Sequence, residues 1–381
     1  MRLLVTNIGR LFTATPRGVL TDAAVLLEDA RIAWVGHVSD GPPAHPHDVI
    51  DVGGALVTPG LIDAHTHPVY AGSRLAEISL RSAGATYDEI SSAGGGIRAT
   101  VAATHEATLA QLDSGLTARL AAWLAAGTTT VEAKTGYHLD HDGELAAVRL
   151  LANRAGVEPR LEVTFLAAHD AGDGGDFAEQ AAAAASWCDE AATAGARFVD
   201  VFCDAGYFTE PQAREVLEAG IAAGLRPRIH ADELAHTGAS QLAAAVGAVS
   251  ADHLLCATED DARALARAGV VATLCPVTAL ALGRMPPARL FADHSVTLAL
   301  GTDHNPGMSG VTSMSMVVGL AVHALGLSVD EALLAATVGG ARSVEAADRG
   351  TVHAGALADL VAWDLGLRPL HVWLNGQPVA L

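Results

Sequence analysis

Two histidines separated by one residue follow an apolar run in "GLIDAHTHPVYAGSR", residues 60–74. Side chains two positions apart on a strand point to the same face, so we expect His65 and His67 to project together. Neutral imidazoles combined with a carboxylate form a mixed nitrogen and oxygen site of the type that binds Zn²⁺, Fe or Mn²⁺. This stretch therefore predicts part of a metal site, and the remaining ligands must come from elsewhere in the chain.

Other apolar runs end in side chains that bind metal ions or transfer protons: His169, His230 with Glu233 beyond it, His253 and Asp303. One histidine in a strand is more often a core residue than a ligand, but several at one edge of a sheet indicate a site. We assign four side chains as metal ligands, namely His65, His67, His230 and Asp303. A catalytic metal keeps one position open for water and lowers the pKa of that water. Glu233 is placed to accept the proton and to deliver it later to a leaving nitrogen.

Eight short apolar or β-branched runs alternate with alanine-rich segments that have the composition of helices. Such alternation predicts parallel strands joined by crossover helices. Eight strands are the number in a closed (β/α)₈ barrel of the TIM type, in which reactive residues lie at the C-terminal ends of the strands. The predicted strands are residues 60–67, 128–134, 162–169, 198–204, 227–233, 248–254, 270–276 and 296–303.

The two ends of the chain have a different residue pattern from the middle. Residues 1–58 form short apolar runs with glycine- and proline-rich turns between them, which predicts strands. The last residues are similar and include Asn375-Gly376 between apolar residues, a β-hairpin signal. We therefore expect residues 1–58 and 350–381 to form one small composite β-sandwich domain, beside a barrel formed by residues 59–349.

Composition limits the classes of partner. The formal net charge is −20 and only 17% of residues are charged, so neither a nucleic acid nor an anionic membrane is expected as a partner. The first residues, "MRLLVTNIGRLF", support neither a signal peptide nor a membrane span. The four cysteines are far apart without a C-x-x-C pair, which favours reduced thiols and a cytoplasmic protein. The oligomeric state stays open, and a homodimer is compatible with a barrel of this size.

Four motifs in this order, "TPGLIDAHTH", "IHADE", "SADHL" and "GTDHNPG", resemble the metal-dependent amidohydrolase superfamily. Four others, "HTHPVYAGSR", "SSAGGGI", "KTGY" and "VFCDAGYFT", resemble the imidazolonepropionase family within it, and the similarity extends over essentially the whole chain. The resemblance implies a metal-bearing barrel with a small composite β domain. It also implies one divalent or trivalent ion per chain, Zn or Fe, and hydrolytic opening of 4-imidazolone-5-propanoate to N-formimidoyl-L-glutamate in histidine degradation.

The resemblance also assigns roles to residues. Glu233 and His253 match the catalytic pair, with Asp303 counted among the catalytic residues as well as the ligands. The positions matching substrate contacts are Arg74, Tyr137, His169, Asn305, Gly307 and Met308. An arginine is suited to bidentate binding of the substrate's propionate. The chain departs from the family pattern at Thr135, His138, His304 and Met308, and in the stretch "LCPVTALALG". These departures concern substrate contacts and leave the metal ligands intact.

Within the superfamily, the main alternative is a two-metal site bridged by a carboxylated lysine on the fourth strand. The predicted fourth strand, "FVDVFCD", contains no lysine, and Lys134 ends the second strand instead. One metal ion is therefore favoured. Lys134 is interpreted as a structural cation or as one that contacts the metal ligands without contacting the metal ion.

Two other functions are compatible with parts of the sequence. An aminohydrolase that deaminates a purine, a pyrimidine or a related ring would use the same metal, Glu233 and His253. Arg74 with Tyr137 argues against it, because a neutral base offers no carboxylate to bind. A barrel retained only as a scaffold would show the loss of a ligand, and none of the four is missing.

Overall fold

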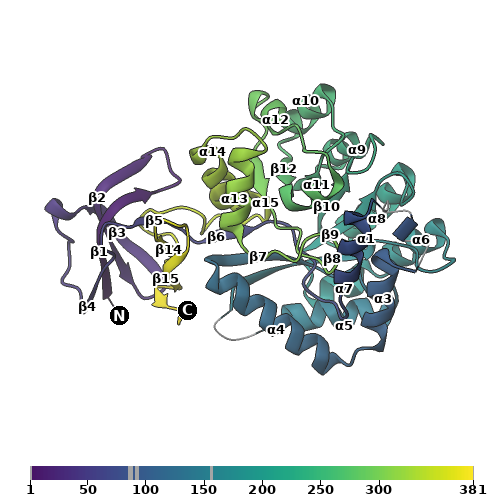
Figure 1. Cartoon of the computed structure of the whole chain (residues 1–381), viewed down its shortest axis with the longest axis horizontal. Helices are drawn as coiled ribbons and strands as arrows, with labels where there is room; N and C mark the ends of the chain where they lie inside the picture. The colour runs from purple at the N-terminus through teal and green to yellow at the C-terminus, as the bar shows by residue number, and fades with distance from the viewer. Residues whose placement is uncertain (1, 85–88, 91–93, 155–157, 381) are drawn as a thin grey trace.

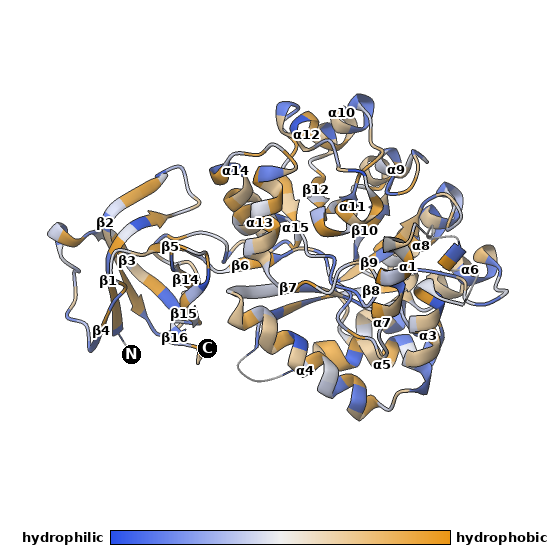
Figure 2. Ribbon diagram, in the orientation of Figure 1, coloured by the Kyte–Doolittle hydropathy of each residue, from blue (hydrophilic) through white to orange (hydrophobic). Residues whose placement is uncertain are grey.

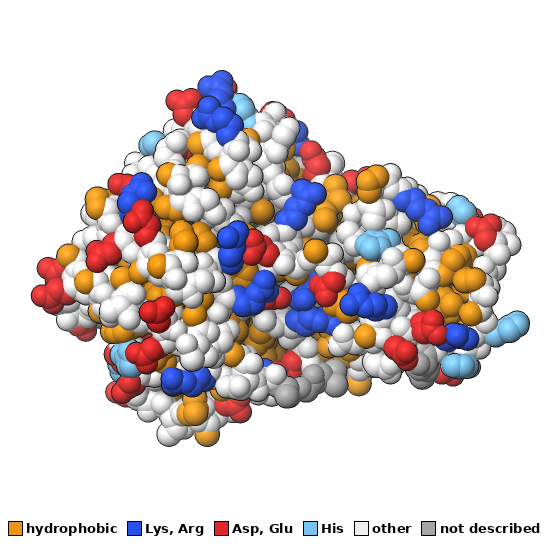
Figure 3. Space-filling model, turned by 180° about the vertical axis from the view of Figure 1, so that it is seen from behind, with side chains coloured by type: hydrophobic (Ala, Val, Ile, Leu, Met, Phe, Trp, Pro, Cys, Tyr) orange, Lys and Arg blue, Asp and Glu red, His pale blue; other side chains and the backbone are white. Residues whose placement is uncertain are grey.

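The computed structural model describes residues 2–84, 89–90, 94–154 and 158–380. Figure 1 shows two parts, a small group of purple and yellow strands on one side and a larger body of strands covered by helices on the other. No helix within the described ranges combines the length and apolarity needed to cross a membrane. The face seen in Figure 3 carries acidic and basic side chains interspersed with one another.

The larger body contains a sheet of eight parallel strands within the described residues, paired in chain order. The first and last strands also meet, because Ala64 N donates to Leu300 O (3.1 Å) and Asp303 N donates to His65 O (3.0 Å). These bonds close the sheet, so the predicted barrel is confirmed, and each of the eight predicted runs overlaps one strand. The strands are β6 (Leu61–Asp63), β7 (Thr128–Lys134), β8 (Arg160–Ala168), β9 (Phe198–Cys203), β10 (Arg226–Ala231), β11 (Ser250–His253), β12 (Val271–Leu274) and β13 (Leu298–Leu300).

Helices surround this barrel (Figure 1). Their amphipathic pattern is clear in α4, which buries Leu112, Leu116 and Leu120 at a spacing of four residues, and Figure 2 shows hydrophobic and hydrophilic residues along it. Thr108 begins α4 with a capping box to Gln111. The described helices are α1 (Leu75–Ser82), α3 (Gly96–Glu106), α4 (Leu109–Ala125), α5 (His141–Ala152), α6 (Phe177–Ser186), α7 (Cys188–Ala194), α8 (Glu210–Ala222), α9 (Ala239–Val246), α10 (Glu259–Ala268), α11 (Pro276–Leu282), α12 (Ala288–Asp293), α13 (Met314–His323), α14 (Val329–Leu334) and α15 (Gly340–Ser343), with short turns η1 (Val38–Asp40) and η2 (Ala335–Gly339).

The small part is one hydrogen-bonded sheet that combines strands from before and after the barrel. Its order is β16-β15-β14-β5-β1-β2-β3, with β4 paired to β1. It has its own hydrophobic core, which includes Leu11, Val25 and Trp373. The composite sheet predicted for the two ends of the chain is thus confirmed, while the domain boundaries at 58/59 and 349/350 stay a prediction. The strands are β1 (Arg2–Phe12), β2 (Val19–Glu28), β3 (Arg31–His37), β4 (Asp48–Asp51), β5 (Leu56–Pro59), β14 (Leu360–Trp363), β15 (Pro369–Leu374) and β16 (Gln377–Pro378).

The predicted hairpin at Asn375-Gly376 joins β15 to β16. Both turn residues have positive φ, 53° and 72°, as a two-residue type I′ turn requires. The small sheet and the barrel are joined closely, because β5 ends at Pro59 and β6 begins at Leu61. Arg160 of β8 also pairs with Asp359 and Asn375, so side chains connect the two parts as well.

Candidate metal and active site

The candidate site lies at the C-terminal ends of the barrel strands. His65 and His67 follow β6, His230 lies in β10, His253 ends β11, and Asp303 follows β13. His253 and Asp303 have positive φ values of 75° and 49°. Such a conformation is costly for residues other than glycine and is found where a site requires it. The strands therefore bring the predicted metal ligands to one buried place.

The polar atoms of this cluster have the spacing of metal ligands. His65 Nε2 and His67 Nε2 are 3.3 Å apart, and Asp303 Oδ1 lies 3.5 Å and 3.3 Å from them. Tetrahedral ligands at ~2.1 Å from an ion stand roughly 3.4 Å from one another. His230 belongs to the same group, since ligand nitrogens of His65, His67 and His230 lie within 4.8 Å of one another. The spacing fits a metal ion at this cluster, and the assignment of all four ligands stays a prediction.

The protonation states of these side chains also fit a bound cation. Burial lowers the pKa of His65 well below its usual value and that of His230 to about 4, so both imidazoles are neutral near pH 7. Burial opposes ionisation of Asp303, but the hydrogen bond from His67 and the nearby His253 hold its pKa well below the usual range. His230 Nε2 is buried with no hydrogen-bond partner among the described residues. Such a neutral imidazole nitrogen can coordinate a cation.

Two aspartates that sequence reasoning missed lie behind the ligands. Asp252 Oδ2 is 2.6 Å from His65 Nδ1, and Asp200 Oδ2 is 3.0 Å from His230 Nδ1. A carboxylate at Nδ1 fixes the ring so that Nε2 points to the metal position. The available signal was an aspartate in the middle of an apolar strand, in "FVDVFCD" and in "SADHL".

Two buried cations balance these carboxylates. Lys134 Nζ lies 2.7 Å from Asp200 Oδ2, 3.0 Å from Glu132 Oε1 and 3.5 Å from Asp252 Oδ2. Arg228 lies 3.2 Å from the same Asp252 oxygen. Burial lowers the pKa of Lys134, but the carboxylates of Asp200 and Glu132 more than offset this and raise it. The ionised core extends through β7 to β11, and Figure 2 shows hydrophilic residues within β7.

Glu233 and His253 form a second pair beside the ligands. Glu233 Oε1 lies 3.4 Å from His253 Nδ1, and both side chains are buried. Burial raises the pKa of Glu233 to about 7, although His253 acts in the opposite direction. Burial lowers the pKa of His253, but the carboxylates of Glu233 and Asp303 outweigh it and raise that pKa overall. A carboxyl group that titrates near neutrality is suited to accepting and returning a proton.

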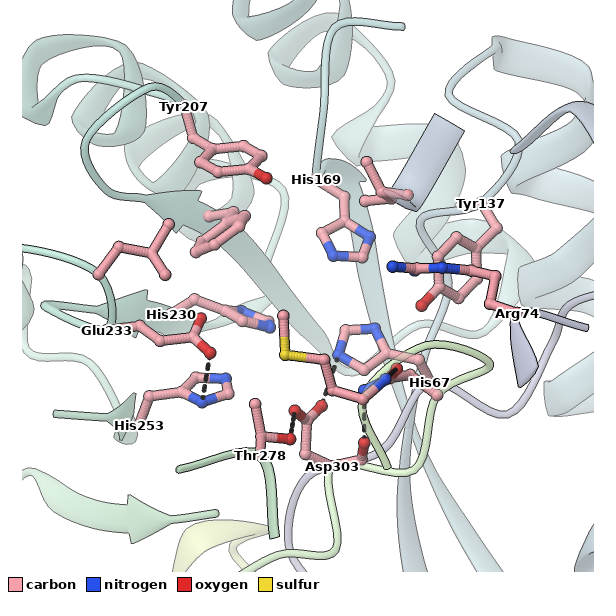
Figure 4. A pocket seen from close by; sticks show the side chains of 15 residues that line it. His67, Arg74, Tyr137, His169, Tyr207, His230, Glu233, His253, Thr278 and Asp303 are labelled. Carbon is pink, nitrogen blue, oxygen red and sulfur yellow. Dashed lines mark hydrogen bonds and ion pairs between the residues drawn. The ribbon is translucent and has the colours of Figure 1, made fainter. Parts of the chain in front are cut away.

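The predicted substrate contacts lie across the pocket from this pair. In Figure 4, Glu233 and His253 are on one side, Arg74 and Tyr137 are on the other, and His67 and His169 lie between them. His169 Nδ1 donates to Gly136 O (2.9 Å), which leaves Nε2 as the acceptor of this ring. The pocket thus has the Glu233–His253 pair at one end and an arginine at the other.

The side chain of Asn305 mainly stabilises the loop that follows Asp303. Asn305 donates to Asp303 O (2.7 Å), and its Oδ1 accepts from the backbone of Gly307 and Met308 at 2.8 Å each. Met308 and Asn305 line the pocket, whereas Gly307 lies against the guanidinium of Arg74.

Most residues at which the chain departs from the family pattern make defined contacts. His304 Nε2 lies 3.1 Å from Tyr70 Oη, Thr135 Oγ1 accepts from the backbone of β8, and the His138 ring covers Gly143. The altered stretch at 274–283 supplies Thr278, whose hydroxyl donates to Asp303 Oδ2. That bond leaves Oδ1 as the oxygen facing the two histidines.

Several pocket residues had no role in the sequence-based interpretation. Tyr207 and Ile97 line the pocket, the first from "VFCDAGYFT" and the second from "SSAGGGI". The motifs indicated these segments without indicating which side chain enters the pocket. Residues 91–93 of "SSAGGGI" lie outside the described residues.

Comparison with known proteins places this site in a family. Residues 56–379 match the Amidohydrolase family. The chain is 41% identical, over an aligned length of 388, to an imidazolonepropionase of Mycolicibacterium smegmatis, covering 99% of this chain and 93% of that protein. It is 42% identical over 368 positions to an imidazolonepropionase of Haloarcula marismortui, covering 93% and 86%. The chain belongs to the imidazolonepropionase family of amidohydrolases.

Solved structures of more distant proteins share the fold of this imidazolonepropionase-family chain. A Xaa-Pro dipeptidase with bound methionine has a TM-score of 0.75 at 16% identity, with all of both chains covered. An adenosine deaminase from Xanthomonas campestris with bound zinc has a TM-score of 0.67 at 22% identity, covering 99% of this chain and 92% of that one. Identities this low support the fold alone. Family membership agrees with the resemblance in the motifs, while the roles of single residues stay predictions.

Proposed function

We propose that this protein is an imidazolonepropionase that hydrolyses the ring amide of 4-imidazolone-5-propanoate to give N-formimidoyl-L-glutamate. One structural observation supports the proposal in addition to family membership. A single pocket holds a ligand-type cluster with Glu233 and His253 at one end and Arg74 at the other (Figure 4). That arrangement suits a substrate with a hydrolysable ring and a carboxylate several ångströms away.

The proposed cofactor is one metal ion per chain, Zn or Fe, held by His65, His67, His230 and Asp303. The spacing and the neutral state of the imidazoles support this ligand set. When bound, the ion supplies a Lewis acid that lowers the pKa of a water molecule and polarises a carbonyl oxygen. The family's metal dependence fits these residues, and the choice between Zn and Fe depends on availability as well as ligand type.

Glu233 is the proposed proton carrier. It accepts a proton from the attacking water as the water oxygen bonds to the ring carbonyl carbon, and it gives that proton to the ring nitrogen as the carbon–nitrogen bond breaks. His253, at 3.4 Å from Glu233, donates a hydrogen bond to the carbonyl oxygen as negative charge develops there. The raised pKa of His253 supports its role as the donor.

Three residues orient the substrate in this proposal. Arg74 binds the propionate through charge-assisted hydrogen bonds, and Tyr137 donates to the same carboxylate or to the ring. His169 accepts a ring N–H at Nε2, because its Nδ1 already donates to Gly136 O. The reacting carbonyl is thereby held at the end of the pocket that contains Glu233.

Ring deamination remains the competing activity, because it would use the same ligands and the same Glu233. Arg74 distinguishes the two, since a guanidinium at the far end of the pocket has no partner on a neutral base. We therefore favour the substrate that carries a carboxylate. A homodimer also stays a prediction.

The decisive experiment incubates the metal-loaded protein with 4-imidazolone-5-propanoate, follows the loss of its ultraviolet absorbance and identifies the product by mass. Parallel incubations with adenine, guanine and cytosine are assayed for ammonia. Arg74→Ala should lower kcat/KM for imidazolonepropanoate by roughly two orders of magnitude, from the loss of about 2–4 kcal/mol of binding. Ammonia release from a base, together with unchanged kinetics in Arg74→Ala, would establish the deaminase instead.

A further inference from the structure

The guanidinium of Arg74 is held from one side by a buried carboxylate. Arg74 Nε donates to Glu77 Oε1 at 2.9 Å, and an Nη donates to Glu77 Oε2 at 3.0 Å. Both side chains are almost fully buried, at 7% and 6% exposed. A bidentate pair of this kind fixes the plane of the guanidinium as well as its position.

Glu77 is itself fixed by the backbone at the start of α3. Its Oε1 also accepts from Gly96 N at 2.8 Å. Among the described residues, at least three N–H groups from two segments therefore meet on the two oxygens of Glu77. A carboxylate accepts at both oxygens, whereas an amide has one accepting oxygen and a donating nitrogen. Glutamine at this position would have to place its NH₂ against an N–H donor.

A glycine in the loop after Asp303 leaves space for the same guanidinium. A Cβ atom at Gly307 would lie 2.5 Å from Arg74 Cζ and 2.5 Å from one of its Nη atoms, closer than real Cβ contacts. The φ angle of Gly307 is not in the left-handed region, so the space rather than the backbone requires glycine there. Glu77 and Gly307 thus confine Arg74 from two elements, α1 and the loop after Asp303.

We propose that Glu77 and Gly307 are positioning residues that set the selectivity of this site for a substrate with a carboxylate tail. They do so by holding the Arg74 guanidinium at one place and in one plane. The inference rests on the proposed function, in which Arg74 binds the propionate. It assigns the selectivity to the support of Arg74 as well as to its charge, because a displaced guanidinium keeps its charge but loses its alignment with the carboxylate.

The test compares two variants that act on Arg74 from two different elements with a matched control. Glu77→Gln removes an acceptor, and Gly307→Ala adds a methyl group under the guanidinium. Gly310→Ala is the control, since a Cβ there meets nothing within 4 Å and its φ is not positive. Each protein is assayed with imidazolonepropanoate and with its methyl ester, which keeps the ring and the scissile bond but lacks the negative charge. Metal content and melting temperature are measured on the same samples.

We expect both variants to lose roughly 10- to 100-fold in kcat/KM for the acid, mainly through KM, because a small displacement at a binding group has that effect. In Glu77→Gln, turnover of the ester and the metal content should stay close to wild type, so the ratio of acid to ester kcat/KM falls. In Gly307→Ala, the acid should lose more than the ester, so the ratio falls there as well. Gly310→Ala should keep the wild-type ratio. If Glu77→Gln fails to fold, Gly307→Ala tests the same point independently.

One kind of result would overturn the positioning role, and another would overturn the proposed function. Folded variants that keep the wild-type ratio of acid to ester, or a Glu77→Gln variant that binds the acid more tightly, would overturn the positioning role. Wild-type protein that shows no preference for the acid, or no turnover of it, would instead overturn the proposed function. The two failures are therefore distinguishable in one set of measurements.

Discussion

Glu233 is the residue on which the proposed chemistry depends most directly. Replacing it with glutamine removes the proton acceptor but leaves His65, His67, His230 and Asp303 in place. Glu233→Gln should therefore keep its metal while kcat falls by roughly 10²-fold or more. Steady-state kinetics with metal analysis of the same preparation tests this, and near wild-type turnover would remove Glu233 from the mechanism.

The pKa of Glu233 also predicts a pH dependence. Burial raises this pKa to about 7, and only the carboxylate form accepts a proton, so activity should fall as the pH drops through the pKa. A bound cation favours the carboxylate and moves this acidic limb below 7. Profiles of kcat/KM measured from about pH 5 to 8 test the prediction, and a flat profile over that range would contradict it.

At the residue scale, the sequence predicted the residues that follow strands better than those that support them. His65, His67, His230 and Asp303 could be predicted from the sequence, because side chains that bind metal ions or transfer protons at strand ends must meet at one rim of a barrel. Glu77 and Thr278 could not, because Glu77 accepts from Gly96 N at the start of α3 and Thr278 of α11 donates to Asp303, so both contacts join separate elements. Their positions depend on how loops pack over the barrel, which local pattern does not encode.

At the scale of elements, the inner faces of β7, β9 and β11 carry ionised groups in place of an apolar core. Lys134 compensates Glu132, Asp200 and Asp252, all fully buried. Lys134→Met should lower the free energy of unfolding by about 3–5 kcal/mol, because it leaves buried carboxylates without this cation. Urea denaturation measures the change.

The control for Lys134→Met is an exposed ion pair. Arg226 pairs with Glu345 at 2.8 Å, with both side chains partly exposed. Arg226→Met should cost about 0–1 kcal/mol, as exposed pairs do. Equal effects of the two substitutions would show that the interior charges are compensated in another way.

The strand β11 also carries the support of a predicted ligand. Asp252→Asn replaces the carboxylate that accepts from His65 Nδ1 with a weaker, neutral acceptor. We expect metal affinity to fall by roughly 10- to 100-fold, as for other groups that orient a ligand histidine. Competition with a chelator, monitored by the metal it removes, tests this. An unchanged midpoint would mean that His65 is oriented by packing alone.

The strands themselves were predicted in the right places, but β6 and β13 are shorter than expected. The chain leaves the ladder after Asp63 and Leu300, and the next residues are joined across the junction by separate backbone hydrogen bonds and an isolated bridge between Thr66 and His304. At Asp303 the positive φ prevents a regular strand. The residues beyond these points are buried but mostly polar, and the sequence does not mark where the ladder ends.

At the scale of the whole molecule, the barrel and the composite sheet are joined by more than the chain. Arg160 of β8 pairs with Asp359, which is 4% exposed, and with Asn375 of the hairpin. Arg160→Ala should lower the free energy of unfolding by about 1–3 kcal/mol, because a buried carboxylate loses its partner. Metal content should stay the same, since the site is formed within the barrel.

Calorimetry of Arg160→Ala tests that expectation, with Arg368→Ala as the control because its pair with Asp364 lies on the surface. Two separated transitions in the first variant would show that the two parts unfold independently once the contact is lost. No change in either variant would mean that the β5–β6 connection and the apolar packing of Val361, Trp363 and Val372 against the barrel couple them.

The insertion of the barrel between β5 and β14 has a consequence during synthesis. Val57 and Thr58 of β5 pair with Ala362 and Val361 of β14, which the ribosome adds only after the entire barrel. At typical elongation rates the edge of β5 waits on the order of tens of seconds for its partner. An unpaired edge is a template for pairing with other chains. We therefore expect nascent chains of this protein to need shielding by chaperones, and slower, cooler expression to increase the recovered fraction.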